Sequence, residues 1–111
     1  MIQRTYQDYF EDILEAIIDI SNFIDDLTFH KFTNDKKTIN AVIRSLEIIG
    51  EASKKVSQEI KENNQNIPWK EMTGMRDKMI HGYFDLDLVT IWETVKNDIP
   101  PLKPLFENLL K

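Results

Sequence analysis

Apolar residues recur at steps of three and four through the first half of the chain, and this spacing constrains the fold more than any other feature. Because an α-helix turns once in about 3.6 residues, such spacing places the apolar side chains on one helix face. The first set predicts a helix over residues 4–29: Tyr6, Tyr9, Phe10, Ile13, Ile17, Ile20, Ile24 and Leu27. A second set predicts a helix over residues 36–62: Ile39, Val42, Leu46, Ile49, Val56 and Ile60. Three residues of types that favour the N-cap precede this second helix: Thr33, Asn34 and Asp35.

The second half of the chain predicts shorter helices with recognisable ends. Pro68 suits the first turn of a third helix over residues 68–82, which Gly74 could interrupt and Gly82 could close. Asp87 is then the expected N-cap of a fourth helix, whose apolar residues are Leu88, Val89, Ile91, Trp92 and Val95. Two adjacent prolines end it, and a short fifth helix follows with Leu102, Leu105, Phe106, Leu109 and Leu110.

The predicted fold is all-α, an up-and-down bundle of four to five helices. Short connections make successive long helices antiparallel neighbours. With 41% apolar and 30% charged residues, 3 glycines and 4 prolines, the composition is that of a folded helical protein. At 111 residues we expect a single domain over residues 1–111, and a homodimer that buries the apolar surface left over.

Charge and cysteine content narrow the function classes. The formal net charge is -5 and the pI is near 5.0, so a grip on nucleic acid through overall charge is excluded and phosphate binding must be local. The absence of cysteine excludes a disulfide framework, thiolate zinc sites and a cysteine nucleophile. Without a signal-like segment or a run of about 18 apolar residues, we expect a cytoplasmic protein.

The second helix carries a charged stripe opposite its apolar face. Arg44, Glu47 and Glu51 share this stripe, and Ile48 lies beside it. One interpretation is a solvated face with weak helical ion pairs. The other is a subunit interface or the edge of a cleft, which a mixture of apolar and charged groups also suits.

The stretch GMRDKMIHGY concentrates groups suited to phosphate chemistry. The guanidinium of Arg76 can present a fork of donors to a phosphate, and the imidazole of His81 can move a proton near neutral pH. The phenol of Tyr83 can bind a phosphate or nucleotide, and a break at Gly82 could turn His81 and Tyr83 toward a common point. The alternative is structural: a surface ion pair, a histidine at a helix end and a ring packed at the bundle edge.

RDKMIHGY contains the R-x4-H-x-Y motif and resembles HEPN-domain ribonucleases of the HepT toxin type, which pair with a minimal nucleotidyltransferase antitoxin. Three longer segments extend the resemblance in the family's order: AVIRSLEIIGEASKKVS, IPWKEMTGMRDKMIHGYFDLD and VTIWETVKNDIPPLKPLFENLL. The first helix resembles the family only as a helix, so no functional residue is carried over there.

The resemblance implies a dimeric helical bundle that cleaves RNA without a metal or other cofactor. Arg76 would bind and stabilise the scissile phosphate, and His81 would act in proton transfer. Tyr83 would be the residue that the nucleotidyltransferase antitoxin modifies with AMP, and Asp77 would support the site. The family's second-helix signature assigns three more residues to the cleft or interface: Arg44, Glu47 and Glu51.

Two other interpretations remain open on the sequence alone. An acidic chain with few basic clusters could be a non-catalytic helical adaptor that binds a nucleotidyltransferase or a nucleotide. His81, Asp85 and Asp87 could instead form a metal site, although one histidine and two carboxylates on a loop are weak evidence for one.

Overall fold

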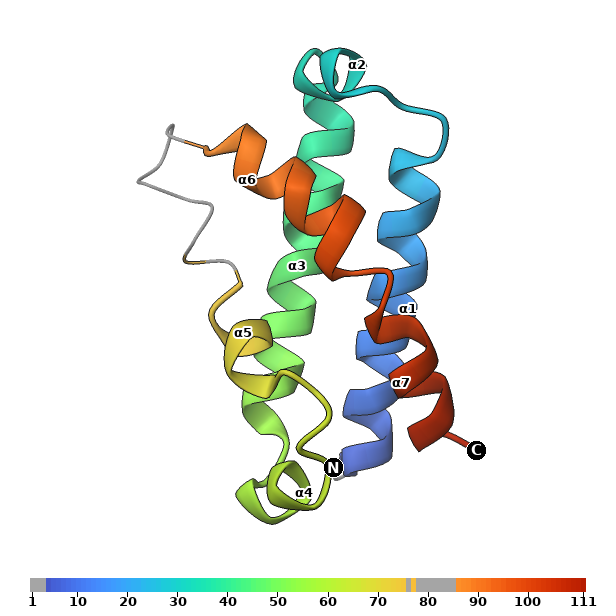
Figure 1. Ribbon diagram of the computed structural model, residues 1–111, viewed down its shortest axis with the longest axis vertical. Helices are drawn as coiled ribbons and strands as arrows, with labels where there is room; N and C mark the ends of the chain where they lie inside the picture. The colour runs from blue at the N-terminus through green and yellow to red at the C-terminus, as the bar shows by residue number, and fades with distance from the viewer. Residues whose placement is uncertain (1–3, 76, 78–85) are drawn as a thin grey trace.

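The computed structural model describes residues 4–75, 77 and 86–111, and over these residues the protein is all-helical, as the sequence predicts (Figure 1). The described helices are α1 (Tyr6–Ile24), α2 (Phe29–Thr33), α3 (Lys36–Lys55), α4 (Gln58–Asn63), α5 (Trp69–Thr73), α6 (Leu88–Glu93), the π-helix η1 (Thr94–Asp98) and α7 (Leu102–Leu109). Among them, none is long and apolar enough to cross a membrane.

The two long helices α1 and α3 lie side by side and form the centre of the bundle (Figure 1). Their facing residues are those that the three-and-four spacing predicts, and each is fully buried: Ile13, Ile17 and Ile20 of α1, and Val42, Leu46 and Ile49 of α3. Burying one such side chain contributes roughly 1.5–3 kcal/mol, so this shared face supplies much of the driving force for folding. α5 packs on α3, and α7 packs on α1.

Three aromatic rings join α1, α5 and α7 at the end of the bundle near the N-terminus. The ring of Phe10 lies 6.3 Å from that of Trp69 and 5.9 Å from that of Phe106, measured between centroids. Trp69 and Phe106 meet edge to face at 5.8 Å. The indole Nε1 of Trp69 also donates to the carbonyl of Asn64 at 3.1 Å. This cluster fixes α5 against α1 and α7.

The first helix ends earlier than its apolar spacing predicts. α1 stops at Ile24 because Asp25 is extended, with a ψ of 131°, and Asp26 takes a positive φ of 61°. Aspartate tolerates that left-handed conformation better than most residues. Thr28 then starts α2, its hydroxyl accepting from the backbone N–H of Lys31 at 3.2 Å. The predicted helix over residues 4–29 is therefore two helices joined by a turn.

The second predicted helix is also divided. α3 ends at Lys55 because Val56 is extended, with a ψ of 134°, and the hydroxyl of Ser57 accepts from the N–H of Ile60 at 3.3 Å. Serine at an N-cap satisfies a donor that the first turn of a helix leaves without a partner. That cap begins α4, so the apolar spacing through Ile60 spans two helices.

Two of the predicted N-caps are confirmed. The carboxylate of Asp35 accepts from the N–H of Thr38 at 3.0 Å and from its hydroxyl at 2.7 Å, which makes Asp35 the cap of α3. Asp87 makes the same pair of bonds with Thr90, at 3.0 and 2.7 Å, and caps α6. Of the other two candidates, Thr33 is the last residue of α2 and Asn34 is its C-cap.

The predicted third helix is short in its described part. Pro68 is the N-cap of α5 and not a first-turn residue, and Gly74 is its C-cap, as the sequence suggested for an interruption there. The expected closure at Gly82 lies outside the described residues. Downstream, α6 continues into the π-helix η1, which ends just before the two prolines, and α7 is the predicted fifth helix.

Candidate active site

The motif residues Arg76, His81 and Tyr83 lie outside the described residues, but the structure fixes the point from which the motif starts. Met75, the residue before Arg76, is 5% exposed and belongs to the core. Its N–H donates to the carbonyl of Met72 at 3.4 Å, so it is tied to the end of α5. Asp77, expected to support the site, is exposed. Buried Met75, two residues after the end of α5, therefore fixes the point from which the motif begins.

α5 approaches α3 closely because position 50 is a glycine. A β-carbon at Gly50 would lie 3.4 Å from the carbonyl oxygen of Met72 and 3.6 Å from that of Thr73. These distances leave room for one carbon and for no larger group. Gly50 thus lets the last carbonyls of α5, those of Met72 and Thr73, rest on the backbone of α3, three or four residues before the motif begins at Arg76.

The charged stripe of α3 begins next to this contact. Glu47 precedes Gly50 by three residues and lies about 60° around the helix from it, toward solvent. It faces Arg44 with an N–O distance of 3.8 Å, and the two side chains are 26% and 64% exposed respectively. Exposed ion pairs of this kind contribute at most about 1 kcal/mol. Part of the stripe is thus an ion pair beside the α5 contact, as the solvated interpretation expects.

The other edge of the stripe borders a groove between α1 and α3. The groove has a volume of about 440 Å³. Its floor includes the small residues Ala16 and Ala52, and half-buried Ile48 lines it. Seven charged side chains also line it: Arg4, Asp12, Glu15, Asp19, Arg44, Glu51 and Lys55. The stripe is therefore the rim of a groove as well as a charged face, which also agrees with the interpretation as a cleft edge.

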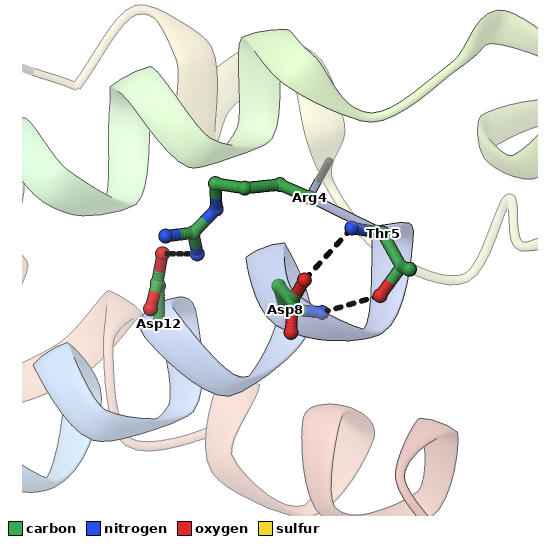
Figure 2. A network of polar contacts seen from close by, with 4 residues as sticks. All are labelled: Arg4, Thr5, Asp8 and Asp12. Carbon is green, nitrogen blue, oxygen red and sulfur yellow. Dashed lines mark hydrogen bonds and ion pairs between the residues drawn. The ribbon is translucent and has the colours of Figure 1, made fainter. Parts of the chain in front are cut away.

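Arg4 reaches into this groove from the start of α1 (Figure 2). Thr5 and Asp8 form a capping box: the N–H of Thr5 donates to the Asp8 carboxylate at 2.8 Å, and the N–H of Asp8 donates to the Thr5 hydroxyl at 3.3 Å. With that turn fixed, the Arg4 guanidinium pairs with the Asp12 carboxylate and lies 5.2 Å from the centre of the Tyr9 ring. Arg4 thus partly neutralises the acidic side of the groove.

α1 contributes to this region in a way that the sequence did not predict. The family resemblance covers the first helix only as a helix. It assigned no functional residue to the first helix, yet Asp12, Glu15 and Asp19 stand opposite Arg44 and Lys55 across the groove. A signal was present, because these three carboxylates are spaced by three and four and so share one helix face. The facing cations, however, come from a segment that only the fold brings near.

Comparison with known proteins identifies the family. Residues 13–109 match the family described as "Ribonuclease HepT-like". The chain belongs to the HepT-like ribonuclease family. The resemblance carried by the motif and the three longer segments is thereby confirmed, and with it the assignment to a family of nucleases that act on RNA.

Several curated relatives match over nearly their whole lengths. A protein of Thermococcus cleftensis named "Probable ribonuclease HepT" is 53% identical over 99% of this chain and 100% of its own length. Two proteins of Methanocaldococcus jannaschii, each named "Putative RNase", are 47% and 46% identical over 100% of this chain and cover 96% and 92% of themselves. No solved structure matches the chain significantly.

The structure describes one of the three residues of the alternative metal site, Asp87. The carboxylate of Asp87 is already bonded to the N–H and hydroxyl of Thr90 as a helix cap. His81 and Asp85, the other two proposed ligands, lie outside the described residues. Within the part of the chain that the structure describes, no group of three or more His, Cys, Asp or Glu side chains is placed to hold a metal ion.

Proposed function

We propose that this chain is a metal-independent endoribonuclease, the toxin of a toxin–antitoxin pair, with Arg76 and His81 as its catalytic residues. Membership of the HepT-like ribonuclease family supports the proposal, because the R-x4-H-x-Y motif at residues 76–83 lies within the matched residues 13–109. The whole chain, residues 1–111, forms the single HEPN domain that performs this function, and no cofactor takes part.

The proposed reaction needs only a proton carrier and a cation at the phosphate. His81 moves the proton as a ribose 2'-hydroxyl oxygen attacks the adjacent phosphorus, and the bond to the 5'-oxygen breaks as that oxygen gains a proton. The products are a 2',3'-cyclic phosphate and a 5'-hydroxyl end. The Arg76 guanidinium donates to the phosphate oxygens, on which negative charge develops in the transition state. Asp77, the exposed residue that follows Arg76 in the sequence, supports this site.

The active unit is proposed to be a symmetric homodimer with the catalytic residues near a shared cleft. The stripe residues Arg44, Glu47 and Glu51 form its interface or cleft edge. Two observations support this role: their stripe combines charges with half-buried Ile48, and it borders a groove that carries both signs of charge. A surface with both signs can pair with its own copy across a two-fold axis.

Regulation is proposed to act through Tyr83. The cognate nucleotidyltransferase antitoxin directs the phenol oxygen to the α-phosphorus of ATP, which attaches AMP and releases pyrophosphate. The attached phosphodiester adds a negative charge that competes for Arg76, and the nucleoside occupies space that the RNA backbone needs. Both effects oppose cleavage.

The deciding experiment is cleavage of total RNA by the purified chain in EDTA, followed by end-group analysis. Wild type should leave 2',3'-cyclic phosphate ends, and Arg76→Ala and His81→Ala should each lose most of the rate, by roughly a hundredfold or more for an acid–base residue. His30→Ala is the matched control, because His30 is the other histidine and lies exposed on α2. It should keep the wild-type turnover rate.

The outcomes separate the proposal from the adaptor alternative. Cleavage that needs a divalent ion, or that survives both substitutions, contradicts the assigned roles. A folded wild-type chain that binds the nucleotidyltransferase but cleaves no RNA supports the adaptor.

A further inference from the structure

The short helices α2 and α6 lie toward the same end of the bundle (Figure 1), and one aromatic ring from each contacts the other. The Phe29 ring of α2 lies 6.1 Å from the Trp92 ring of α6, between centroids, at an interplanar angle of 54°. Phe29 is 39% exposed and Val89, one turn before Trp92, is 53% exposed. Phe29, Val89, Trp92 and Lys96 together are called the aromatic platform below.

A buried aromatic residue supports the platform from the core side. Phe32, which is 0% exposed, packs on Trp92 with 5.1 Å between ring centroids. The Lys96 ammonium lies 5.4 Å from the centre of the Trp92 ring, a cation–π contact. Rings already fixed in place lose little conformational entropy when a ligand stacks on them.

The surroundings of the platform differ in charge from the rest of this acidic chain. Residues 27–40, which include α2 and the start of α3, contain three lysines and one aspartate, whereas the whole chain has a net charge of -5. The lysines Lys31, Lys36 and Lys37 are exposed, as is Lys96. Lys96 also lines a small pocket with Asp25, Asp26 and Lys103, so the charged side chains of that pocket balance.

We propose that the aromatic platform binds single-stranded segments of the RNA substrate, with a base stacking on the exposed ring of Phe29, which Trp92 supports, and phosphates near Lys96. This inference rests on the proposed ribonuclease function and gives the acidic chain the local RNA contact that its net charge requires. Aromatic faces beside lysines are the usual means of holding unpaired nucleic acid, because every base has a π-face and every nucleotide a charge. Bases inside a duplex are already stacked, so duplex RNA should bind weakly.

Binding to a 2'-O-methyl single-stranded oligonucleotide tests the platform separately from catalysis, because that probe lacks the attacking hydroxyl. Phe29→Leu keeps an apolar side chain but removes the ring, and should weaken binding about tenfold by fluorescence anisotropy. Phe29→Tyr keeps a ring and should restore most of the affinity. Phe23→Leu is the matched control, since Phe23 is 38% exposed on α1 and belongs to no ring contact described here.

Salt dependence separates the lysine from the rings. Lys96→Gln should lower the slope of log K against log salt by about 0.7, the value for one phosphate contact on a single strand. Phe29→Leu should leave that slope unchanged while lowering affinity at every salt concentration. Lys54→Gln, an exposed lysine in the last turn of α3, is the charge-matched control and should alter neither quantity.

Three results would overturn the platform. These are unchanged affinity in Phe29→Leu, equal binding of duplex and single strand, and loss of dimerisation or antitoxin binding in Phe29→Leu with RNA affinity intact. The last result would make the surface a protein-docking site. Failure of the proposed catalysis would appear differently, as cleavage that survives His81→Ala while probe binding still depends on Phe29.

Discussion

Gly50 of α3 faces the carbonyl oxygen of Met72 in α5 at a distance that leaves room for a single added carbon, 3.4 Å from the position of a β-carbon. This contact sets the spacing between the helix that carries the charged stripe and the helix from which the motif starts. It therefore links the packing of the bundle to the geometry of the proposed active site.

Substitutions at position 50 should separate stability from activity. Gly50→Ala should fold and melt at least as high as wild type, because its β-carbon fits and alanine is favoured over glycine in a helix by about 1 kcal/mol. Gly50→Val adds two methyl groups toward the carbonyls of Met72 and Thr73 and should push α5 outward. We expect Gly50→Val to lose RNA cleavage by more than its loss of stability explains, measured by cleavage rate beside thermal melting. Equal activity in the two variants would show that the α3–α5 spacing does not position the motif.

Incubation with the cognate nucleotidyltransferase and ATP should add an adenylyl-sized mass to the wild-type chain and abolish RNA cleavage. The fold and dimeric state should persist, because the modification blocks the phosphate site and leaves the core intact. Tyr83→Phe should gain no mass and should escape inhibition if the phenol serves only as the acceptor, and intact mass spectrometry measures this directly. Tyr6→Phe is the control, since Tyr6 is 50% exposed on α1. A mass increment that persists in Tyr83→Phe would exclude this residue as the switch.

A charge placed at Ile48 should dissociate the proposed dimer. Ile48 is half-buried in the groove beside Arg44 and Glu51. Ile48→Glu replaces an apolar contact of the proposed interface with a negative charge, and burying that charge in a dimer costs free energy. We expect a monomer by light scattering at micromolar concentration, with helical content unchanged. Ile18→Glu is the control because Ile18 is 39% exposed on α1 and lines none of the groove. A wild-type monomer would contradict the assembly itself, and a dimeric Ile48→Glu would move the interface elsewhere.

Most of the fold follows from the sequence because helix burial depends on spacing that can be counted. Ile13, Ile17 and Ile20 face Val42, Leu46 and Ile49 as their three-and-four steps require. The predicted helix boundaries are wrong where the apolar spacing continues past a turn that ends the helix. Ser57 and Thr28 begin new helices through a single side-chain bond each, and local capping outweighs the periodicity of Leu27 and Ile60.

Less of the candidate site than of the fold can be predicted from the sequence, because the parts of the site come from separate helices. The motif at residues 76–83 and the stripe of α3 can each be read locally, and family membership supports the resemblance that both carry. The contact between Gly50 and Met72 cannot be predicted from the residues around Gly50, because a glycine in a helix does not reveal which other segment packs against it. Nor can the pairing of Phe29 with Trp92, which lie 63 positions apart in the sequence and meet only through the fold.

The stability of α3 should depend on pH through its N-cap. The hydroxyl of Thr38, followed by the Thr38 N–H and the charge of Lys37, lowers the pKa of Asp35 below its ordinary value of 3.8. A carboxyl whose folded-state pKa is lowered stabilises the fold fully above its unfolded pKa, and that contribution disappears as the pH falls through the lower folded value.

Asp35→Asn keeps a good cap but has no charge to lose, so its urea midpoint should fall less than that of wild type on acidification below 3.8. Asp35→Ala should unfold at lower urea than both at neutral pH, because the N–H of Thr38 loses its acceptor. Parallel urea titrations of the three proteins, followed by circular dichroism from neutral pH into this acidic range, measure both effects. If wild type and Asp35→Asn lose stability equally on acidification, the ionised cap does not contribute in the way that its bonds to Thr38 indicate.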